Sequence, residues 1–567
     1  MKLNAKQKRA VFEFEGSCLI TASPGTGKTR TLVARGINKL ESLPKHKSIA
    51  LITYTNAGAD EIASRLITEK PVFIGTIHSF CLEYILRPFS WLNNWNRPRV
   101  ISYEQQEIFF EENTDIDLEA NFGQNKFDEL GKIEKNIDGS LNCDVEWNHS
   151  ITIQEVATRY YDYQTHLKVI DFNEILYRSY YILKNNPFVC KSLSSKFYEI
   201  LVDEFQDTNL YQYEILKSIY DFGDCTFFMV GDSKQRIFSF AGAIENSFEK
   251  AMADFNSEPL DLTESYRSTN NIVNAYSALF ENHPIIENKS DYCNLNIDVN
   301  FFQTKKDNHQ AIVNSVIKQL IEKANINLSE IAVLSTSWFT AYPLSKVLRQ
   351  NYHIVGLGAL PHKSISNSSI SLLRILSKHY VEPSIRKLRS IKRNIEMHLL
   401  ENGLQLSEKE FNNKTNALIT RFLALDSEKD IVAGLKEVQE IFNNVFKVPH
   451  TTFDEILDKI SQEEKQSWSI GQYLKTLAGV DGINCNTIHK VKGLEYDAVI
   501  LNEMNENKIP YQKFLGKERG NYIYQELSEE DIENGRNLFY VGLSRARKYL
   551  IILHNWYPSM FIEIIRK

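Results

Sequence analysis

Short runs of β-branched and aliphatic residues recur along the chain, and each run is followed by a loop or by a helical pattern. They form two groups, the first made of Cys18–Thr21, Ile49–Thr53, Glu199–Val202 and Thr226–Val230, and the second of Ile331–Ser335, Ala498–Leu501 and Tyr549–Leu553. Short, largely apolar runs of this kind are typical of strands buried on both faces of a parallel sheet. The pattern therefore predicts an α/β fold with two parallel-sheet cores.

Two long segments interrupt these cores. Residues 81–168 are rich in aromatic and acidic side chains, and residues 361–480 are charged, with predicted helices over Ser384–Gly403, Glu428–Phe446 and Thr452–Gln466. We therefore expect a first core from residues 1–80 and 169–265, a second core from residues 266–360 and 481–567, and a mainly helical insertion in each. Neither insertion contains a motif with recognisable chemistry, so scaffold helices are the main interpretation.

Length and composition agree with this division. The chain has 567 residues, which at roughly 150 residues per domain suggest about four structural units. A hydrophobic content of 43% with 24% charged residues is that of a globular protein and excludes a disordered chain. The net charge of -7 excludes a wholly basic surface, but it does not exclude a local basic groove. The tail from His554 to Lys567 is too short for a further domain.

The cysteines and the N-terminus bear on location. The 7 cysteines are scattered and include no C-x-x-C pair, so disulfide frameworks, zinc ribbons and iron–sulfur clusters lack support, and a reducing, cytoplasmic compartment is expected. The basic N-terminus leads into an apolar stretch broken by Glu13 and Glu15, which does not fit a signal peptide. No run approaches about 18 apolar residues, so no membrane span is expected.

The strongest local motif is Ala22-Ser23-Pro24-Gly25-Thr26-Gly27-Lys28-Thr29, between a predicted strand and the helical pattern Arg30–Leu40. Its glycines let backbone N–H groups turn towards phosphate oxygens, Lys28 reaches the β- and γ-phosphates of a nucleotide, and the Thr29 hydroxyl is a ligand for Mg²⁺. Ala22 stands where the general pattern has glycine. The motif predicts nucleotide binding, and an ordinary strand–turn–helix is the alternative.

Acidic and amide side chains follow two further predicted strands. Asp203 ends one strand and suits Mg²⁺ coordination, while Glu204 beside it suits a general base that orients the attacking water. Gln235 follows the next strand, and because parallel strands present their C-terminal ends on the same side, it is placed to sense the γ-phosphate. With the phosphate loop, these residues predict hydrolysis of a nucleoside triphosphate. Phe238 and Phe240 come next, and they either pack in a core or stack on bases.

Together with several further segments, these motifs resemble superfamily 1 helicases of the UvrD/Rep/PcrA type, in the family's order from residue 3 to about residue 553. Alanine is common at the first loop position in that family, so Ala22 fits it. Leu3–Gln7 resembles the adenine-reading segment, in which the Gln7 amide can pair with the acceptor and the donor of the adenine edge. The resemblance implies ATP and Mg²⁺ as cofactors.

Three segments resemble the strand-contacting segments of the family, namely Thr53–Ala57, Gly75–Phe80 and Asp171–Leu176. By that resemblance Tyr54, Phe238 and Phe240 stack on bases, while Thr55, Thr76 and His78 touch the sugar–phosphate chain. Duplex contacts by the two insertions are the alternative to a scaffold role.

The second core supplies the remaining segments of the resemblance. Glu264–Ser268 is similar to the family's N-Y-R-S-T segment, which implies that Tyr266 stacks on adenine, with Arg30 on its other face, and that Arg267 reaches the γ-phosphate. Phe539–Arg547 is similar to the Y-V-x-x-T-R-A segment, which implies that Arg545 is an arginine finger. A guanidinium on the opposite core stabilises the charge of phosphoryl transfer only when the cleft is closed.

Thr487–Glu495 is similar to the family's T-x-H-x-x-K-G-x-E segment, which couples DNA to the nucleotide. By this resemblance Thr487 and His489 contact DNA, and Gly493 and Glu495 lie near the γ-phosphate and ribose. The chain departs from the family at Ser239–Ala243, where many relatives have Arg-Trp-Arg-Gly-Ala. One basic contact is absent there and a smaller ring replaces the indole, so a weaker grip on the strand is expected, since stacking contributes about 1–3 kcal/mol per base. Asn534-Gly535 likewise stands in place of a charged pair.

The expected function is an ATP-dependent DNA translocase or helicase on single-stranded or tailed DNA, with 3′-to-5′ travel implied by the resemblance, in phage defence or DNA repair. The alternative is a nucleotide-hydrolysing sensor that regulates a partner nuclease with little unwinding. Compact UvrD-like chains of this size also resemble the helicase-like subunit of the Gabija anti-phage system, whose partner in a hetero-oligomer is an OLD-family (TOPRIM) nuclease. A repair helicase that works alone is a further alternative, and a fused nuclease is not expected.

Overall fold

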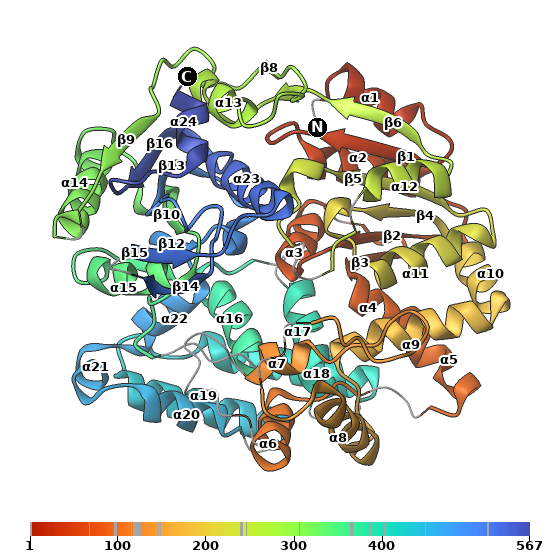
Figure 1. Cartoon of the computed structure of the whole chain (residues 1–567). Coiled ribbons are helices and arrows are strands. Elements are labelled where there is room, and N and C mark those ends of the chain that lie inside the picture. Colours follow the sequence, from red (N-terminus) through yellow and green to blue (C-terminus); the bar gives the residue numbers. More distant parts are fainter. Residues whose placement is uncertain are drawn as a thin grey trace.

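A computed structural model shows two α/β cores side by side, with helical segments below both (Figure 1). The structure describes residues 3–66, 68–95, 99–114, 116, 126–145, 147, 149–238, 242–244, 246–305, 307–362, 368–384, 388–401, 404, 406–447, 450–518 and 521–566.

The first sheet has the strand order β3-β2-β4-β5-β1-β6, and all its neighbouring strands are parallel. The strands are β1 Cys18–Ala22, β2 Ser48–Thr53, β3 Val72–Thr76, β4 Phe197–Val202, β5 Thr226–Gly231 and β6 Glu258–Leu262. The four predicted strands of this group are confirmed. The pattern missed β3 and β6 because they lie at the two edges of the sheet, where solvent replaces some apolar neighbours.

The second sheet has the order β11-β12-β10-β13-β16-β9, again with parallel neighbours. Its strands are β9 Asn300–Gln303, β10 Ile331–Ser335, β11 Ile354–Gly356, β12 Ile483–Thr487, β13 Tyr496–Leu501 and β16 Ala546–His554. The three predicted strands are confirmed. Strand β12 was missed because its sequence, INCNT, alternates apolar and polar residues although it lies inside the sheet.

Helices cover both faces of each sheet, and successive strand residues point to opposite faces. In the first core, Ile20 and Val230 pack with α1 Ala5–Phe12, α2 Lys28–Glu41 and α3 Asn56–Arg65. Leu19 and Met229 pack with the other layer, which is α4 Ile77–Cys81, α9 Phe172–Asn185, α10 Pro187–Lys196, α11 Leu210–Asp221 and α12 Ser247–Asp254. The second core has α13 Asn270–Ser277, α23 Glu529–Leu543 and α24 Met560–Arg566 on one face, and α14 His309–Glu322 and α15 Trp338–Leu348 on the other.

The segment between β3 and β4 has its own small core. Ile101, Phe109, Tyr160 and Val169 belong to that core, which holds α6 Tyr103–Asn113, α7 Lys126–Gly131 and α8 Ile153–Leu167 together. Three short helical turns precede this core, namely η1 Leu82–Leu86, α5 Arg87–Phe89 and η2 Ser90–Asn93. The side chains of Leu82, Ile85 and Leu86 in the first of them pack in the core of the first sheet.

The segment between β11 and β12 is a helical bundle with a separate core. Its helices are α16 Ser368–Val381, α17 Leu388–Glu401, α18 Glu408–Leu423, α19 Ile431–Phe446, α20 Thr452–Lys459, α21 Gln462–Ser467 and α22 Ile470–Ala478. The run Thr452–Gln466, predicted as one helix, is two helices, because Ser461 accepts a hydrogen bond from Glu464 N and begins α21. The bundle reaches the first core through an ion pair of 2.6 Å between Arg393 and Asp60.

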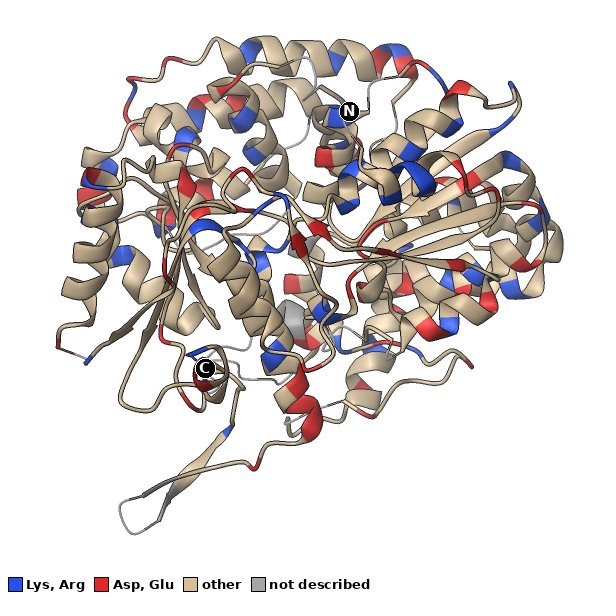
Figure 2. Cartoon of the chain, turned by 90° about the horizontal axis from the view of Figure 1, so that it is seen from above, with Lys and Arg blue, Asp and Glu red and all other residues tan. Residues whose placement is uncertain are grey.

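Two short pairs of strands complete the described chain, β7 Glu264–Ser265 with β8 Glu287–Asn288, and the hairpin β14 Phe514–Glu518 with β15 Asn521–Tyr524. Acidic and basic residues alternate along the ribbon over the whole view (Figure 2). Among the residues that the structure describes, no helix combines the length and the apolarity that a membrane crossing needs.

Candidate active site

The predicted phosphate loop joins β1 to α2, and two of its glycines adopt left-handed backbone conformations. Gly25 has φ +75° and Gly27, which precedes the first turn of α2, has φ +81°. A Cβ atom at Gly25 would lie 2.6 Å from Arg267 Cβ and 2.7 Å from Ser265 Oγ. The loop therefore needs glycine both for its conformation and for its close packing against the segment that follows β7.

The N-terminal helix closes one end of this loop. Gln7 Nε2 donates to Thr26 O at 2.9 Å, and Gln7 Oε1 accepts from Asn4 N at 3.0 Å. Asn4 Nδ2 in turn donates to the Tyr266 hydroxyl at 3.1 Å. The structure thus brings Gln7 and Tyr266 of the predicted adenine site together through Asn4, while Arg30 is exposed in the first turn of α2. The Gln7 amide is engaged with the backbone, so its direct contact with adenine stays a prediction.

Lys28 and Thr29 face the carboxylates at the end of β4. The Lys28 Nζ atom is buried and has no hydrogen-bond partner. Thr29 Oγ1 donates to Asp203 Oδ2 at 3.3 Å. Glu204, the next residue, has a left-handed backbone with φ +53°, which is strained for a non-glycine residue. The turn at Glu204 places two adjacent carboxylates beside the phosphate loop.

The pKa values of the two carboxylates, Asp203 and Glu204, are shifted in opposite directions. Burial and the neighbouring Glu204 charge raise the pKa of Asp203 well above its ordinary value. Burial opposes ionisation of Glu204 as well, but the ammonium groups of Lys492 and Lys28 outweigh it and lower the pKa of Glu204. Glu204 is therefore a carboxylate at neutral pH, as a residue that accepts a proton from water must be. A cation beside Asp203 would restore its ionised form.

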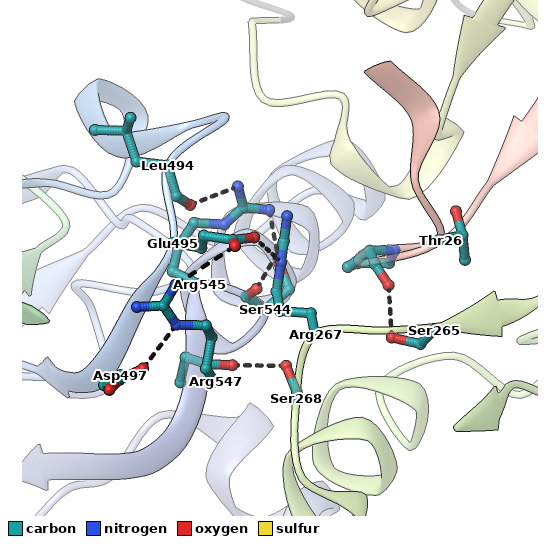
Figure 3. Close-up of polar contacts among 12 residues, drawn as sticks. Thr26, Ser265, Arg267, Ser268, Leu494, Glu495, Asp497, Ser544, Arg545 and Arg547 are labelled. Carbon is teal, nitrogen blue, oxygen red and sulfur yellow. Dashed lines mark hydrogen bonds and ion pairs between the residues drawn. The ribbon is translucent and has the colours of Figure 1, made fainter. Parts of the chain in front are cut away.

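Two arginines of the second core and an amide of the first core meet across the cleft. Arg267 Nε donates to Glu495 Oε2 at 2.6 Å, and its Nη1 donates to Ser544 O at 3.0 Å (Figure 3). Arg545 Nη2 donates to Gln235 Oε1 at 3.3 Å. Arg545 is 2% exposed, and burial together with the charge of Arg267 lowers its pKa to about 9. Two guanidinium groups that repel each other in a buried cleft favour an anionic ligand between them and the phosphate loop.

Lys492 was not singled out from the sequence, yet it connects the two cores. Its Nζ donates to Asp207 Oδ2 at 2.5 Å and to Gln235 O at 2.7 Å, and lies 3.9 Å from Glu204 Oε2. Lys492 lies in the loop after β12, next to Gly493, whose φ is +87°. Asp207 was missed too, although it lies close to Asp203 and Glu204 in the chain. Lys492 lies within the segment Thr487–Glu495, but its pairing with Asp207 spans 285 positions of the chain and leaves no local signal.

The predicted strand-contacting aromatic residues lie on the same side of the molecule as Lys492. Tyr54 and Phe238 stack with ring centroids 4.9 Å apart and 26° between their planes. Lys492 Nζ lies 5.2 Å from the centre of the Phe238 ring, and His489 lies 6.2 Å from the same ring. Phe240 lies outside the described residues. One lysine therefore contacts both Asp207 of the first core and a ring of the stacked pair.

The hydroxyl groups predicted to contact a sugar–phosphate chain begin helices. Thr55 Oγ1 accepts from Gly58 N at 3.0 Å at the start of α3, and Thr76 Oγ1 accepts from Ser79 N at 3.3 Å at the start of α4. His78 packs edge-on against the exposed ring of Phe172, with the ring centroids 5.6 Å apart. Both helices begin after the carboxyl ends of the adjacent strands β2 and β3. These groups therefore lie together at that end of the first sheet.

Thr487 and His489 lie at the edge of a large cavity. It has a volume of about 1650 Å³ and is bounded by the carboxyl ends of β10, β11 and β12 and by α16 of the helical bundle. Ile237, the residue before Phe238, also lines it. His489, which lines the cavity, lies 6.2 Å from the ring of Phe238, so the cavity ends near the stacked pair Tyr54–Phe238.

Comparisons with known proteins agree with this geometry. The UvrD/REP helicase N-terminal domain matches residues 3–256, and the UvrD-like helicase C-terminal domain matches residues 410–556. The whole chain is 26% identical to a probable DNA helicase II homolog of Mycoplasma genitalium, over 87% of that protein. It is also 25% identical to the ATP-dependent DNA helicase Rep of Buchnera aphidicola subsp. Acyrthosiphon pisum, over 100% of this chain and 96% of that protein.

The chain belongs to the UvrD-like helicases of superfamily 1, which makes it an enzyme of the ATP-dependent DNA helicase class. The residues of its cleft fit a Mg²⁺-bound nucleotide. Lys28 Nζ is a buried cation without a hydrogen-bond partner, and Thr29 and Asp203 offer the oxygen ligands that Mg²⁺ prefers.

Proposed function

We propose that the cleft between the two cores hydrolyses ATP and that this hydrolysis moves the protein along single-stranded DNA in the 3′-to-5′ direction. The observation that carries the proposal is the position of Lys492. It bonds to Asp207 and to the backbone of Gln235 in the first core, and it lies over the Phe238 ring that stacks on Tyr54. A movement of the second core would therefore act together on Asp207 and Gln235, beside the nucleotide, and on the stacked pair Tyr54–Phe238.

In this proposal Lys28 and the loop N–H groups hold the β- and γ-phosphates, and Thr29 and Asp203 hold Mg²⁺, which neutralises phosphate charge. Glu204 accepts a proton from the attacking water, because Lys492 and Lys28 keep it ionised. Arg267 and Arg545 supply positive charge from the second core, and Gln235 links Arg545 to the first core. Glu495 orients Arg267 through their hydrogen bond.

On the DNA side, Tyr54 and Phe238 stack on bases, and Thr55, Thr76 and His78 contact the sugar–phosphate chain, with Thr487 and His489 across the cleft. The substrate is single-stranded or tailed DNA in the cytoplasm. The domain division is proposed as expected from the sequence, with cores over residues 1–80 with 169–265 and 266–360 with 481–567.

For the biological setting we propose phage defence or DNA repair. The resemblance to the Gabija helicase-like subunit supports an OLD-family nuclease as partner. Co-expression with such a nuclease, followed by size-exclusion chromatography, tests this: a stable hetero-oligomer is expected, and separate elution would leave a repair helicase that works alone.

The proposal predicts that single-stranded DNA stimulates ATP hydrolysis and that Phe238→Ala weakens this stimulation. Loss of a stacking ring costs about 1–3 kcal/mol, so the DNA concentration for half-maximal stimulation should rise about 5- to 150-fold. Steady-state ATPase titrations with an oligonucleotide measure it. Phe222→Ala, at the exposed C-terminal end of α11, is the matched control. A rate that DNA leaves unchanged in the wild-type protein would favour the nucleotide-sensing alternative.

A further inference from the structure

Two exposed aromatic rings stack on each other in the cavity of the second core. Trp338 and Phe339 begin α15, and their ring centroids lie 4.1 Å apart with 26° between the planes. They are 46% and 47% exposed. Tyr342, one turn further along the helix, meets Trp338 edge-on at 6.4 Å. Two large rings held flat against each other and open to solvent suit a ligand that has a flat apolar face.

The position of this pair follows from the topology of the sheet. Strands β10 and β12 are neighbours, and Ser335 at the end of β10 pairs with Thr487 at the end of β12. The rings follow β10, and His489 follows β12, so they share the crevice at the carboxyl ends of the parallel strands. All of them line the same cavity, and the ring of His489 lies 6.2 Å from the ring of Phe238 in the stacked pair Tyr54–Phe238.

The charge of the cavity is positive although that of the chain is negative. Among the described residues that line it, Arg374, Lys378, Lys490 and Lys508 carry positive charge and Asp531 alone carries negative charge. Lys508 is paired with Glu503 outside the lining, so Arg374, Lys378 and Lys490 account for the positive charge. Arg374 comes from α16, and it is exposed together with Lys490. The net charge of -7 therefore coexists with a local basic groove. Cations beside aromatic faces are the usual combination in sites for single-stranded nucleic acid.

We propose that Trp338 and Phe339 form a base-stacking platform that holds single-stranded DNA on the second core, while Arg374 and Lys490 contact its phosphates. The inference rests on the proposed function and assigns new residues to it. A duplex presents only base edges in its grooves, whereas an unpaired base offers its face to a ring. The platform is thus selective for single strands, and α16 gives the helical bundle a direct part in binding.

The platform also accounts for the departure at Ser239–Ala243, where the large indole of many relatives is missing. The indole of Trp338 lies on the opposite core instead. Each core then holds one stacked pair, Tyr54–Phe238 on the first and Trp338–Phe339 on the second. Movement between the cores changes the distance between two grips on the same strand.

Binding of a fluorescein-labelled oligo(dT) to the full-length protein, followed by anisotropy at several salt concentrations, tests the platform. Trp338→Ala should raise Kd about 5- to 150-fold, the equivalent of about 1–3 kcal/mol, and leave the salt dependence unchanged because stacking releases no counterions. Trp338→Phe should recover most of the affinity. Arg374→Gln should instead reduce the slope of log Kd against log salt by about 0.7.

Trp556→Ala is the matched control, since this ring is 63% exposed and is not among the residues that line the cavity, and thermal unfolding shows whether each variant is folded. A folded Trp338→Ala protein whose Kd stays within about twofold of wild type would overturn the platform and leave the proposed function intact. A wild-type protein that binds no oligo(dT) would overturn both. A Kd that rises equally for hairpin duplex would show a general basic surface and would also overturn the platform.

Discussion

Lys492 shows how much one side chain contributes to this site. Its ammonium group bonds to Asp207 Oδ2, lowers the pKa of Glu204 and lies over the Phe238 ring. A buried ion pair of this kind contributes little net stability, because desolvation offsets the attraction. We therefore interpret it as a link between the nucleotide and the strand.

Lys28→Ala should reduce ATP hydrolysis by at least about 10²-fold, because the buried ammonium has no partner in the chain and is the counterion for the phosphates. Steady-state phosphate release measures this. Lys45→Ala, on an exposed loop, is the control and should hydrolyse ATP at the wild-type rate. Wild-type turnover by the Lys28 variant would mean that the phosphate loop is not the site.

The two histidines of the strand-contacting region should stay neutral over the physiological range. Burial lowers the pKa of His78 to about 4, and burial with the charges of Lys492 and Lys490 lowers that of His489 to about 4. Between about pH 6 and pH 8 neither imidazole gains a proton, so the salt dependence of DNA binding should not change. A slope that steepens by about 0.7 on going to pH 6 would show an imidazolium–phosphate contact and contradict this.

At the scale of elements, α2 is tied to its neighbours by a buried arginine. Arg35 Nη2 lies 2.7 Å from Glu199 Oε1 on β4, and its Nη1 donates to Ala10 O and Val11 O at the end of α1. Both side chains of the ion pair are fully buried. Helices α1 and α2 carry Gln7 and the phosphate loop, so this arginine fixes the two elements that bound the nucleotide end of the cleft.

Glu199→Gln should lower the free energy of unfolding of the first core by about 3–5 kcal/mol, because it leaves the Arg35 charge buried without its partner. Urea denaturation followed by circular dichroism measures the loss. Glu155→Gln breaks the exposed ion pair with Arg159 and should cost less than about 1 kcal/mol. Equal losses in the two variants would contradict a special role for the buried pair.

At the scale of the whole molecule, the residues that follow β4 and β5 of the first sheet face residues of the second core that lead into β13 and β16, and a helical insertion extends each core. The residues proposed for ATP hydrolysis lie where the two cores meet. Hydrogen bonds between Arg545 and Gln235 and between Lys492 and Asp207 join the cores there. Such contacts open and close with the cleft, which is how hydrolysis can be coupled to movement.

The sequence predicted the parts of the molecule whose signal is local. Strands such as β2 and β4 were predicted because most of their residues are apolar, and the phosphate loop because its residues are contiguous. Strand β6, EPLDL, was missed because an edge strand is half solvated. The pairing of Lys492 with Asp207 was missed because it joins distant segments. The rings of Trp338 and Phe339 are adjacent in the chain, but the cavity that they line is built from distant segments and leaves no local signal.

The most direct test of the motor is strand displacement from duplexes that carry a 3′ or a 5′ single-stranded tail, with wild-type protein and Glu204→Gln. We expect the wild-type protein to displace the strand of the 3′-tailed duplex only when ATP is hydrolysed, and the variant to bind the same DNA without displacing it. Displacement by the Glu204→Gln protein at the wild-type rate, or displacement without ATP, would contradict coupling between the cleft and the strand.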